Sequence, residues 1–244
     1  MLIDLHAKTN ASEGVSISPR QLLEHAQKAG LNGVALCETE RTARCPEILE
    51  LAASEFSDLS VFIGVEIATD RGILLGFAPY IDDFYLNEEW AWLTHSTTPA
   101  ASAVIEVFDE QDGVVIAARP YDLEIPFNMG DYIFEIDRIG GVEVFTPRVG
   151  RIQQNFALEA ATFMGLGTTG GSDPSDDPSV IGKYATFFEE DLSSQRLFVD
   201  ALRDSEFWAV QIGEADGKGR TSRKKSGRNN KKRGRNRGRR RGRR

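Results

Sequence analysis

Cysteine and histidine are scarce in this 244-residue sequence, which has two cysteines and three histidines. The two cysteines, Cys37 and Cys45, are too few for a disulfide framework, and such a low number is typical of a reducing compartment. Eighteen consecutive apolar residues occur nowhere, and no basic segment followed by a long apolar run stands at the N-terminus. We therefore expect a cytoplasmic protein with neither a secretion signal nor a membrane partner.

Acidic side chains are absent from the C-terminal segment 218–244. This segment holds sixteen of the 29 Lys and Arg residues, which leaves 13 basic residues against 37 acidic ones in residues 1–217. The net charge at neutral pH is therefore about −24 for residues 1–217 and about +16 for residues 218–244. The change in composition predicts one domain over residues 1–217 and a separate tail over residues 218–244.

The tail contains only Gly, Lys, Arg, Ser, Thr and Asn, so it has no apolar side chains with which to build a core. This composition predicts disorder and binding to the phosphates of RNA or other nucleic acid through counterion release. Folding back onto the acidic domain, or a role in solubility alone, is the alternative. The candidate nucleic-acid-binding residues are Arg223, Lys224, Lys225, Arg228, Lys231, Lys232, Arg233, Arg235, Arg237, Arg239, Arg240 and Arg241.

Short apolar runs alternate with amphipathic stretches along residues 1–217, which is typical of repeated βα units. The runs are continuously apolar, so they predict a parallel sheet covered by helices, in the α/β class. Polar residues follow many runs, which favours a distorted barrel whose strand ends meet at one mouth. The predicted strands are 2–5, 34–37, 61–67, 73–77, 114–117, 141–145 and 208–212, the predicted helices 19–29, 46–56, 100–109, 152–164 and 193–204, and 165–171 is predicted as a glycine-rich turn.

Residues 79–99 are rich in both aromatic and acidic side chains. Since most aromatic clusters serve packing, we expect an irregular connection that packs Tyr85, Trp90 and Trp92 on the barrel. A mobile lid over the barrel mouth is the alternative.

Five signature regions, spread over residues 3–187, occur in a fixed order along the chain. They are Ile3–Thr9 with Ala11–Gly14, Ala35–Glu40, Gly64–Ile67, Val115–Tyr121 and Gly171–Ser175. In that order they resemble the D-L-H-x-H and A-S-D-G, A-I-T-D-H-D, G-V-E-I, A-H-P-Y and G-S-D-A-H motifs of the polymerase-and-histidinol-phosphatase (PHP) superfamily. This resemblance implies a distorted (βα)7 TIM-like barrel whose strand ends hold two or three divalent metals that hydrolyse phosphoesters.

The chain departs from the family at most of the metal ligands that the resemblance implies. Ligand positions are kept at His6, Glu66 and Asp173 and changed at Glu38, where the family usually has Asp. The family has His at the positions of Lys8, Thr39, Arg119 and Ser175, and near that of Gly72. Ammonium and guanidinium groups take over the neutralising role of metals, because a buried carboxylate without a partner is costly.

Three interpretations of this altered site stay open. In the first, His6, Glu66 and Asp173 are catalytic and, with Glu38, hold one Mg²⁺ or Mn²⁺, while Lys8 and Arg119 bind phosphate. In the second, the site has no metal and binds a phosphate-containing ligand or RNA without chemistry. In the third, the charges form an ion-pair network that only holds the barrel mouth together. Two further arginines, Arg148 and Arg151, are interpreted as a solvated helix start, and a position facing the barrel mouth is the alternative for both.

We therefore predict a degenerate PHP-type protein, non-catalytic or weakly catalytic, that is tethered to RNA or other nucleic acid by its tail. The alternative is a metal-dependent phosphoesterase, either a phosphatase or a nuclease, that acts on a nucleotide or an RNA end. These two predictions differ in whether a divalent metal is bound and whether phosphoesters are hydrolysed.

Overall fold

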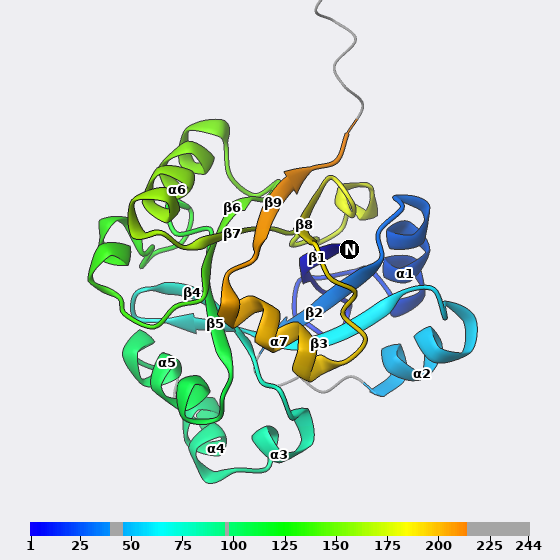
Figure 1. Cartoon of the computed structure of the whole chain (residues 1–244), viewed down its shortest axis with the longest axis horizontal. Helices are drawn as coiled ribbons and strands as arrows, with labels where there is room; N and C mark the ends of the chain where they lie inside the picture. The colour runs from blue at the N-terminus through cyan, green and yellow to red at the C-terminus, as the bar shows by residue number, and fades with distance from the viewer. Residues whose placement is uncertain (40–45, 96–97, 214–244) are drawn as a thin grey trace, which may run out of the picture. The chain divides into compact units, whose positions relative to one another are not determined.

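The computed structural model describes residues 1–39, 46–95 and 98–213 (Figure 1). The predicted tail, its candidate nucleic-acid-binding residues and the predicted boundary between residues 217 and 218 lie outside the described residues. In the part of the chain that the structure describes, no helix has the length and apolar character needed to cross a membrane.

Nine strands form one sheet in the order β7-β6-β5-β4-β3-β2-β1-β8-β9. Hydrogen bonds from β7 to the last two strands nearly close this sheet into a barrel. Thr168 Oγ1 accepts from the Ala209 N–H of β9 at 3.0 Å, and Thr186 Oγ1 of β8 accepts from the Gly170 N–H at 3.0 Å. The strands are β1 (Leu2–Ala7), β2 (Gly33–Thr39), β3 (Ser60–Thr69), β4 (Gly72–Phe77), β5 (Val114–Ala118), β6 (Gly141–Phe145), β7 (Gly167–Gly170), β8 (Tyr184–Phe188) and β9 (Phe207–Gln211).

The strand directions differ from the predicted parallel (βα)7 barrel. Strands β4 and β8 run antiparallel to both of their neighbours, whereas the remaining seven strands share one direction. For β4 the reason is local, because only two residues, Asp70 and Arg71, separate it from β3. Antiparallel strands can be joined by a two-residue hairpin, whereas a parallel pair needs a long crossover. Gly72, with φ of +103°, supplies the left-handed backbone at this turn.

Helices cover the outside of the barrel, and one helix closes its amino end (Figure 1). Outward side chains of β2, such as Val34, pack under one group of helices, and outward side chains of β5, such as Val115, pack under another. Inward side chains pack with Phe198 of α7, whose ring stacks on Phe62 at 4.3 Å between ring centroids. The helices are α1 (Pro19–Lys28), α2 (Pro46–Glu55), α3 (Ile81–Tyr85), α4 (Glu88–His95), α5 (Ala101–Glu110), α6 (Arg151–Met164) and α7 (Gln195–Asp204), with 3₁₀ turns at Gly130–Glu135 and Pro178–Val180.

Helix α1 begins and ends as the sequence predicts. The Ser18 hydroxyl accepts from the N–H of Gln21, and the Gln21 side chain accepts from the N–H of Ser18, which makes a complete capping box. Pro19 stands in the first turn, and Gly30 has φ of +76° just after the helix. These local signals fix the ends of the helix independently of the rest of the fold.

Residues 79–99 form short helices, α3 and α4, where an irregular connection was predicted. The predicted packing of Tyr85 and Trp90 is confirmed, because their rings meet at 4.8 Å between centroids and both contact Phe84. Trp92, by contrast, is 61% exposed, so the prediction that it packs on the barrel is wrong. On a helix, Trp90 and Trp92 are about 200° apart, and both cannot face the core.

Candidate functional site

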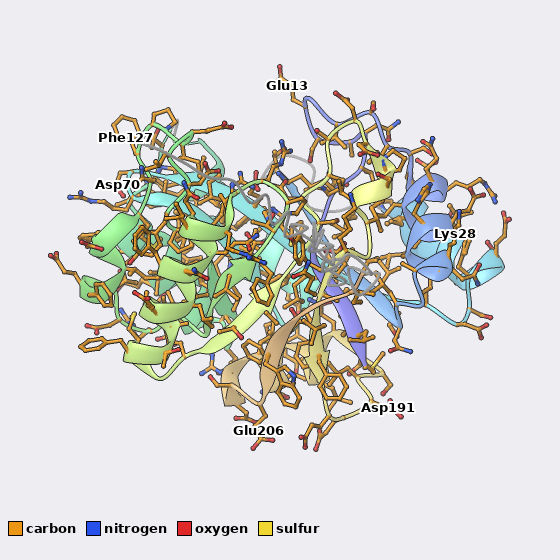
Figure 2. All side chains as sticks on the ribbon, turned by 90° about the horizontal axis from the view of Figure 1, so that it is seen from above. Glu13, Lys28, Asp70, Phe127, Asp191 and Glu206 are labelled. Carbon is orange, nitrogen blue, oxygen red and sulfur yellow. The ribbon has the colours of Figure 1, made fainter. Side chains whose placement is uncertain are left out.

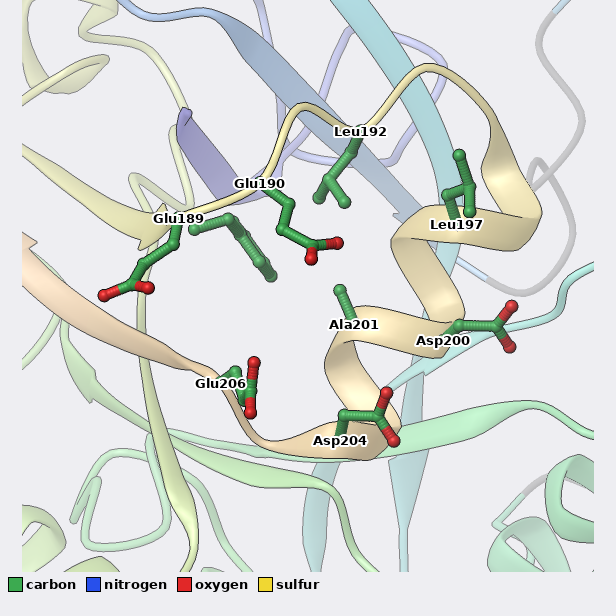
Figure 3. A pocket seen from close by; sticks show the side chains of 9 residues that line it. Glu189, Glu190, Leu192, Leu197, Asp200, Ala201, Asp204 and Glu206 are labelled. Atoms are coloured by element: carbon green, nitrogen blue, oxygen red, sulfur yellow. The ribbon is translucent and has the colours of Figure 1, made fainter.

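Labelled residues mark the two ends of the barrel in Figure 2. Glu13 and Phe127 lie at the end where the seven codirectional strands finish, and Asp191 and Glu206 lie at the opposite end. The second end has a pocket of about 230 Å³ with apolar walls and no basic residue among the described residues that line it (Figure 3). Its acidic side chains are Glu189, Glu190, Asp200, Asp204 and Glu206.

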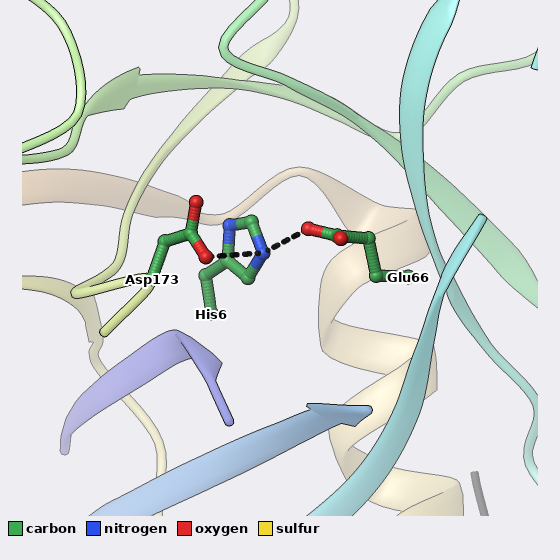
Figure 4. Close-up of side chains that lie close together, drawn as sticks. All are labelled: His6, Glu66 and Asp173. Atoms are coloured by element: carbon green, nitrogen blue, oxygen red, sulfur yellow. Dashed lines mark hydrogen bonds and ion pairs between the residues drawn. The ribbon is translucent and has the colours of Figure 1, made fainter. Parts of the chain in front are cut away.

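The predicted catalytic residues His6, Glu66 and Asp173 lie together at the first end (Figure 4). His6 Nε2 is 2.8 Å from Glu66 Oε2 and 3.7 Å from Asp173 Oδ1. The side chains of His6 and Asp173 are fully buried, and that of Glu66 is 12% exposed. One ligand atom from each residue lies within 4.8 Å of the other two, which is the spacing of a candidate metal site.

Strands β1 and β7 approach closely to bring His6 and Asp173 together. The register of β1 against β2 shifts between Asp4 and Ala7, and irregularities of this kind re-aim side chains near active sites. The N–H of Asp173, three residues after β7, donates to the carbonyl oxygen of His6 at 2.7 Å. A Cβ at Gly171 would lie 2.4 Å from His6 Cβ, so a glycine is required for this approach.

Two cations, Lys8 and Arg119, lie against the two carboxylates of the cluster. Lys8 Nζ is 2.8 Å from Glu66 Oε2 and 2.9 Å from Asp173 Oδ1. Arg119 Nη1 pairs with Asp173 Oδ2, and Arg119 Nη2 is 3.9 Å from Glu66 Oε2. Asp122 Oδ2, 3.2 Å from Arg119 Nε, holds the other side of the guanidinium. The structure thus brings five of the six predicted residues into one ion-paired cluster, and Glu38 lies outside it. We call His6, Lys8, Glu66, Arg119 and Asp173 the mouth cluster.

Backbone strain accompanies this ion pairing. Arg119 and Asp173 have φ angles of +34° and +36°, where residues other than glycine are uncommon. Such conformations cost on the order of 1–3 kcal/mol each and persist where the surroundings fix them. The pair between the two side chains is one such constraint on both segments.

A third cation, Arg148, also reaches the mouth cluster. Its Nε donates to the backbone oxygen of Asp173 at 2.9 Å and lies 3.2 Å from Asp173 Oδ2. The interpretation of Arg148 as part of a solvated helix start is therefore wrong, although its side chain is 40% exposed. Arg151 is exposed at the start of α6, as expected.

Glu143 was not among the predicted site residues, yet it lies buried beside His6. Its Oε1 is 3.0 Å from His6 Nδ1, while Glu66 faces the other ring nitrogen. The two carboxylates thus hold the imidazole ring from both of its nitrogen atoms. The sequence did hold a signal for Glu143, which is a single acid within the apolar run Gly141–Phe145. Val142 and Val144 pack outward under the helices, so the residue between them projects into the barrel.

Glu38, a predicted metal ligand, binds the loop after β1. Its Oε1 accepts from the N–H and the hydroxyl of Thr9 at 2.9 and 2.5 Å, and its Oε2 accepts from the hydroxyl of Ser12. Burial raises the pKa of the Glu38 carboxyl, against the effect of these hydrogen bonds. Side chains alternate along a strand, so Glu38 shares the face of Leu36 rather than the inward face of Cys37.

Charge pairing controls the ionisation of Glu66. Burial acts to raise the pKa of this carboxyl, but the hydrogen bond from His6 and the charges of Lys8, His6 and Arg119 together hold it well below the usual value of 4.5. Glu66 is therefore a carboxylate throughout the neutral range. Its negative charge is compensated by side chains of the chain itself.

The donor set does not fit a divalent ion while Lys8 stays in place. An ion bound to both Glu66 Oε2 and Asp173 Oδ1 would occupy the space between them, and the ammonium of Lys8 lies within 2.9 Å of both atoms. The other oxygen of Asp173 is held by Arg119 and Arg148. A metal site also needs an open position for water or substrate, and these three cations surround the carboxylates that would form it.

No family model matches the chain. A segment of 73 residues, 29% of the chain, is 41% identical to a 5′-3′ exoribonuclease of Haemophilus influenzae. The matched segment spans 26% of the length of that exoribonuclease.

Solved structures resemble the chain over most of its length. PsfC from Pseudomonas syringae has a TM-score of 0.59 at 15% identity, covering 86% of this chain and 91% of PsfC. A protein described as a metal-dependent phosphoesterase from Bifidobacterium adolescentis has a TM-score of 0.54 at 22% identity, and the match covers 82% of this chain and 95% of that protein. An amidohydrolase from Chromobacterium violaceum, with bound sulfate and no metal, has a TM-score of 0.55 at 13% identity. The match covers 87% of this chain and 99% of the amidohydrolase. The chain thus shares the fold of these three proteins, and the resemblance to the PHP superfamily stays a prediction.

Proposed function

We propose that this chain is a degenerate phosphoesterase-like barrel of the PHP type that hydrolyses phosphoesters weakly or not at all and is tethered to RNA by its basic tail. The observation that carries the proposal is the position of Lys8 Nζ, 2.8 and 2.9 Å from the carboxylates of Glu66 and Asp173. An ammonium neutralises carboxylates as a metal does, but it does not lower the pKa of a bound water to the neutral range.

A phosphate-containing ligand is the ligand class that the mouth cluster supports best. Arg119 and Arg148 offer guanidinium groups suited to phosphate oxygens, and Lys8 adds a point charge. All three are already paired with carboxylates, so a phosphate competes with Asp173 and Glu66 for them. We therefore expect weak binding of phosphate at the mouth, and the tail supplies most of the affinity for RNA.

Reversing the substitutions that removed the family ligands tests the lack of a metal. The wild-type protein is expected to purify without stoichiometric Mg²⁺, Mn²⁺ or Zn²⁺, and the Lys8→His/Arg119→His variant to bind Mn²⁺ at least about tenfold more tightly. Isothermal titration calorimetry and elemental analysis measure both quantities. Equally tight Mn²⁺ binding by the wild-type protein would contradict the proposal.

The role of the tail is tested in the full chain. A variant with the twelve candidate tail residues replaced by Gln is expected to lose binding to a single-stranded RNA at low salt, because phosphate contacts dominate such binding. Anisotropy of labelled RNA across a salt series measures this loss. Unchanged affinity in the variant would show that the RNA binds elsewhere or not at all.

A metal-dependent phosphoesterase acting on a nucleotide or an RNA end is the second candidate function. It is favoured by the spacing of His6, Glu66 and Asp173 and by the match to an exoribonuclease. A hydrolysis assay with Mg²⁺, Mn²⁺ or Zn²⁺ decides between the two candidates. Turnover by the wild-type protein that Asp173→Ala abolishes would establish the second candidate and defeat the first.

A further inference from the structure

A second surface feature, separate from the mouth cluster, is a groove of about 660 Å³ between helix α6 and residues 121–134. It has no residue in common with the mouth cluster or with Arg148. It is lined by Tyr121, Leu123, Asn128, Gly130, Asp131, Phe134, Phe156, Glu159, Ala160 and Phe163. We call it the aromatic groove.

Large apolar side chains line this groove and face solvent. Phe163 is 83% exposed, Phe156 49% and Phe134 45%. Phe134 and Phe163 meet edge to face at 5.5 Å between ring centroids, which gives the groove an ordered aromatic wall. Contiguous exposed apolar surface of this kind marks an interaction site in a soluble domain, whereas isolated exposed residues do not.

The sequence of α6 explains why the groove exists. Its buried residues, Ala157, Ala160 and Ala161, are small, whereas the neighbouring Phe156 and Phe163 are exposed. Residues seven apart lie on the same side of a helix, so the two rings form a stripe along the groove. An amphipathic surface helix normally buries its large apolar residues, whereas α6 leaves Phe156 and Phe163 exposed.

The charged residues that line the groove are acidic. Asp131 and Glu159 line it, and no basic residue does among the described residues. The field of these carboxylates acts on Tyr121, whose pKa is raised to about 12 by burial, by Asp131, which also accepts a hydrogen bond from its hydroxyl, and by Glu159. The groove therefore combines an apolar floor with negative charge at its rim.

We infer that the aromatic groove binds a helical segment of a partner protein whose apolar face is flanked by Lys or Arg. Apolar anchors spaced along one helix face fit a groove whose wall is itself a helix, and basic flanks complement Asp131 and Glu159. A peptide that binds by adding a β-strand would instead need an open sheet edge, and the groove is walled by a helix and a loop. The groove, with a volume of about 660 Å³, has room for several side chains of such a helix.

The same charges disfavour the other occupants. RNA would bring phosphates against Asp131 and Glu159 without a compensating cation in the groove. A second copy related by a twofold axis would bring the same patch, with the same two acids, against itself. A basic amphipathic helix avoids both repulsions.

The test uses two labelled peptides of about 16 residues with the same Leu face, one with Lys and one with Gln at the flanking positions. In full-length protein at about 0.15 M salt, the Lys peptide is expected to bind at least about tenfold more tightly than the Gln peptide by fluorescence anisotropy. Phe163→Ser is expected to weaken both peptides about tenfold, and Asp131→Asn/Glu159→Gln to remove the preference for Lys. Because Phe163 is largely exposed, its replacement leaves the core intact.

Matched controls lie elsewhere on the chain. Trp92→Ser removes another exposed aromatic side chain, on α4, and Asp204→Asn/Glu206→Gln removes two acids from the pocket at the opposite end. Both controls are expected to bind the peptides as the wild-type protein does. Loss of the Lys preference in the second control, with the groove variants unaffected, would overturn the inference.

Two further outcomes would also overturn it. A labelled single-stranded RNA that loses affinity on Phe163→Ser would assign the groove to nucleobases. Sedimentation of the wild-type protein as a dimer, and of Phe163→Ser as a monomer, would assign it to a second copy of the chain.

Discussion

Both ends of the barrel gather carboxylates, but the acids at the mouth are buried with their cations, whereas those at the other end are largely exposed. At the mouth, Glu66 and Asp173 are buried and paired with Lys8 and Arg119. At the opposite end, no basic residue is among the described residues that line the pocket, Asp200 pairs with the partly exposed Arg196 at 3.0 Å, and Asp204 faces water. The difference teaches that burial, rather than the number of acids, forces pairing, because desolvated charge is costly and hydrated charge is not.

The largest effect is expected from removing the central buried acid. Asp173→Ala leaves the buried Lys8 and Arg119 without a main partner, so the free energy of unfolding is expected to fall by about 3–5 kcal/mol. Asp204→Ala, its matched control at the other end, is expected to change it by no more than about 0.5 kcal/mol. Urea unfolding followed by circular dichroism measures both. Similar losses in the two variants would erase the distinction between the ends.

Removing a cation from the mouth is expected to cost less, because others remain. Lys8→Met is expected to lower the free energy of unfolding by about 2 kcal/mol, since Glu66 and Asp173 keep Arg119 as a partner. Mn²⁺ is expected to restore part of the loss by occupying the vacated position, while leaving the wild-type protein unchanged. Thermal unfolding with and without Mn²⁺ measures this. Equal stabilisation of both proteins would mean that Lys8 does not exclude the ion.

Acid is expected to weaken the mouth through Glu66. Its pKa is lowered in the folded protein, so it contributes stability that is present above the unfolded value of about 4.5 and is lost as pH falls below it. Asp4 and Glu38, whose pKa values are raised by burial, contribute with the opposite sign and gain stability as pH falls. In a series from neutral pH to about pH 3, Glu66→Gln is expected to flatten the loss of stability below about pH 4.5, and Glu38→Gln to remove the gain in stability that comes as pH falls towards about 4.5. Urea midpoints across this range check both signs.

The smallest effect is expected at the acidic pocket. Asp204→Asn/Glu206→Gln relieves repulsion among exposed carboxylates, so the melting temperature is expected to rise by about a degree or less at low salt. At high salt the rise is expected to vanish, because screening removes the repulsion. A rise that survives high salt would show that these acids are less hydrated than their exposure indicates.

The elements predicted best are those with strong local signals. Helix α1 carries its own caps at Ser18 and Gly30, and β6 coincides with its apolar run at Gly141–Phe145. Strand β7 was missed because Gly-Thr-Thr-Gly has little strand propensity, and β8 because it follows an irregular segment. These two strands depend on pairing partners far away in the sequence.

The sequence by itself determined which residue types stand at the strand ends, including His6, Lys8, Glu66, Arg119 and Asp173. Side-chain identity and local propensity are properties of the chain alone, so motif order and helix caps reveal them.

Only the tertiary structure decided which of these groups touch. Glu143 joins His6 and Arg148 joins Asp173, while Glu38 turns to Thr9. These choices depend on strand register and on the face from which each side chain projects, because a shift of one residue moves a side chain to the other side of a sheet. Strand register depends on pairing throughout the barrel, so it cannot be predicted from the sequence of a single strand.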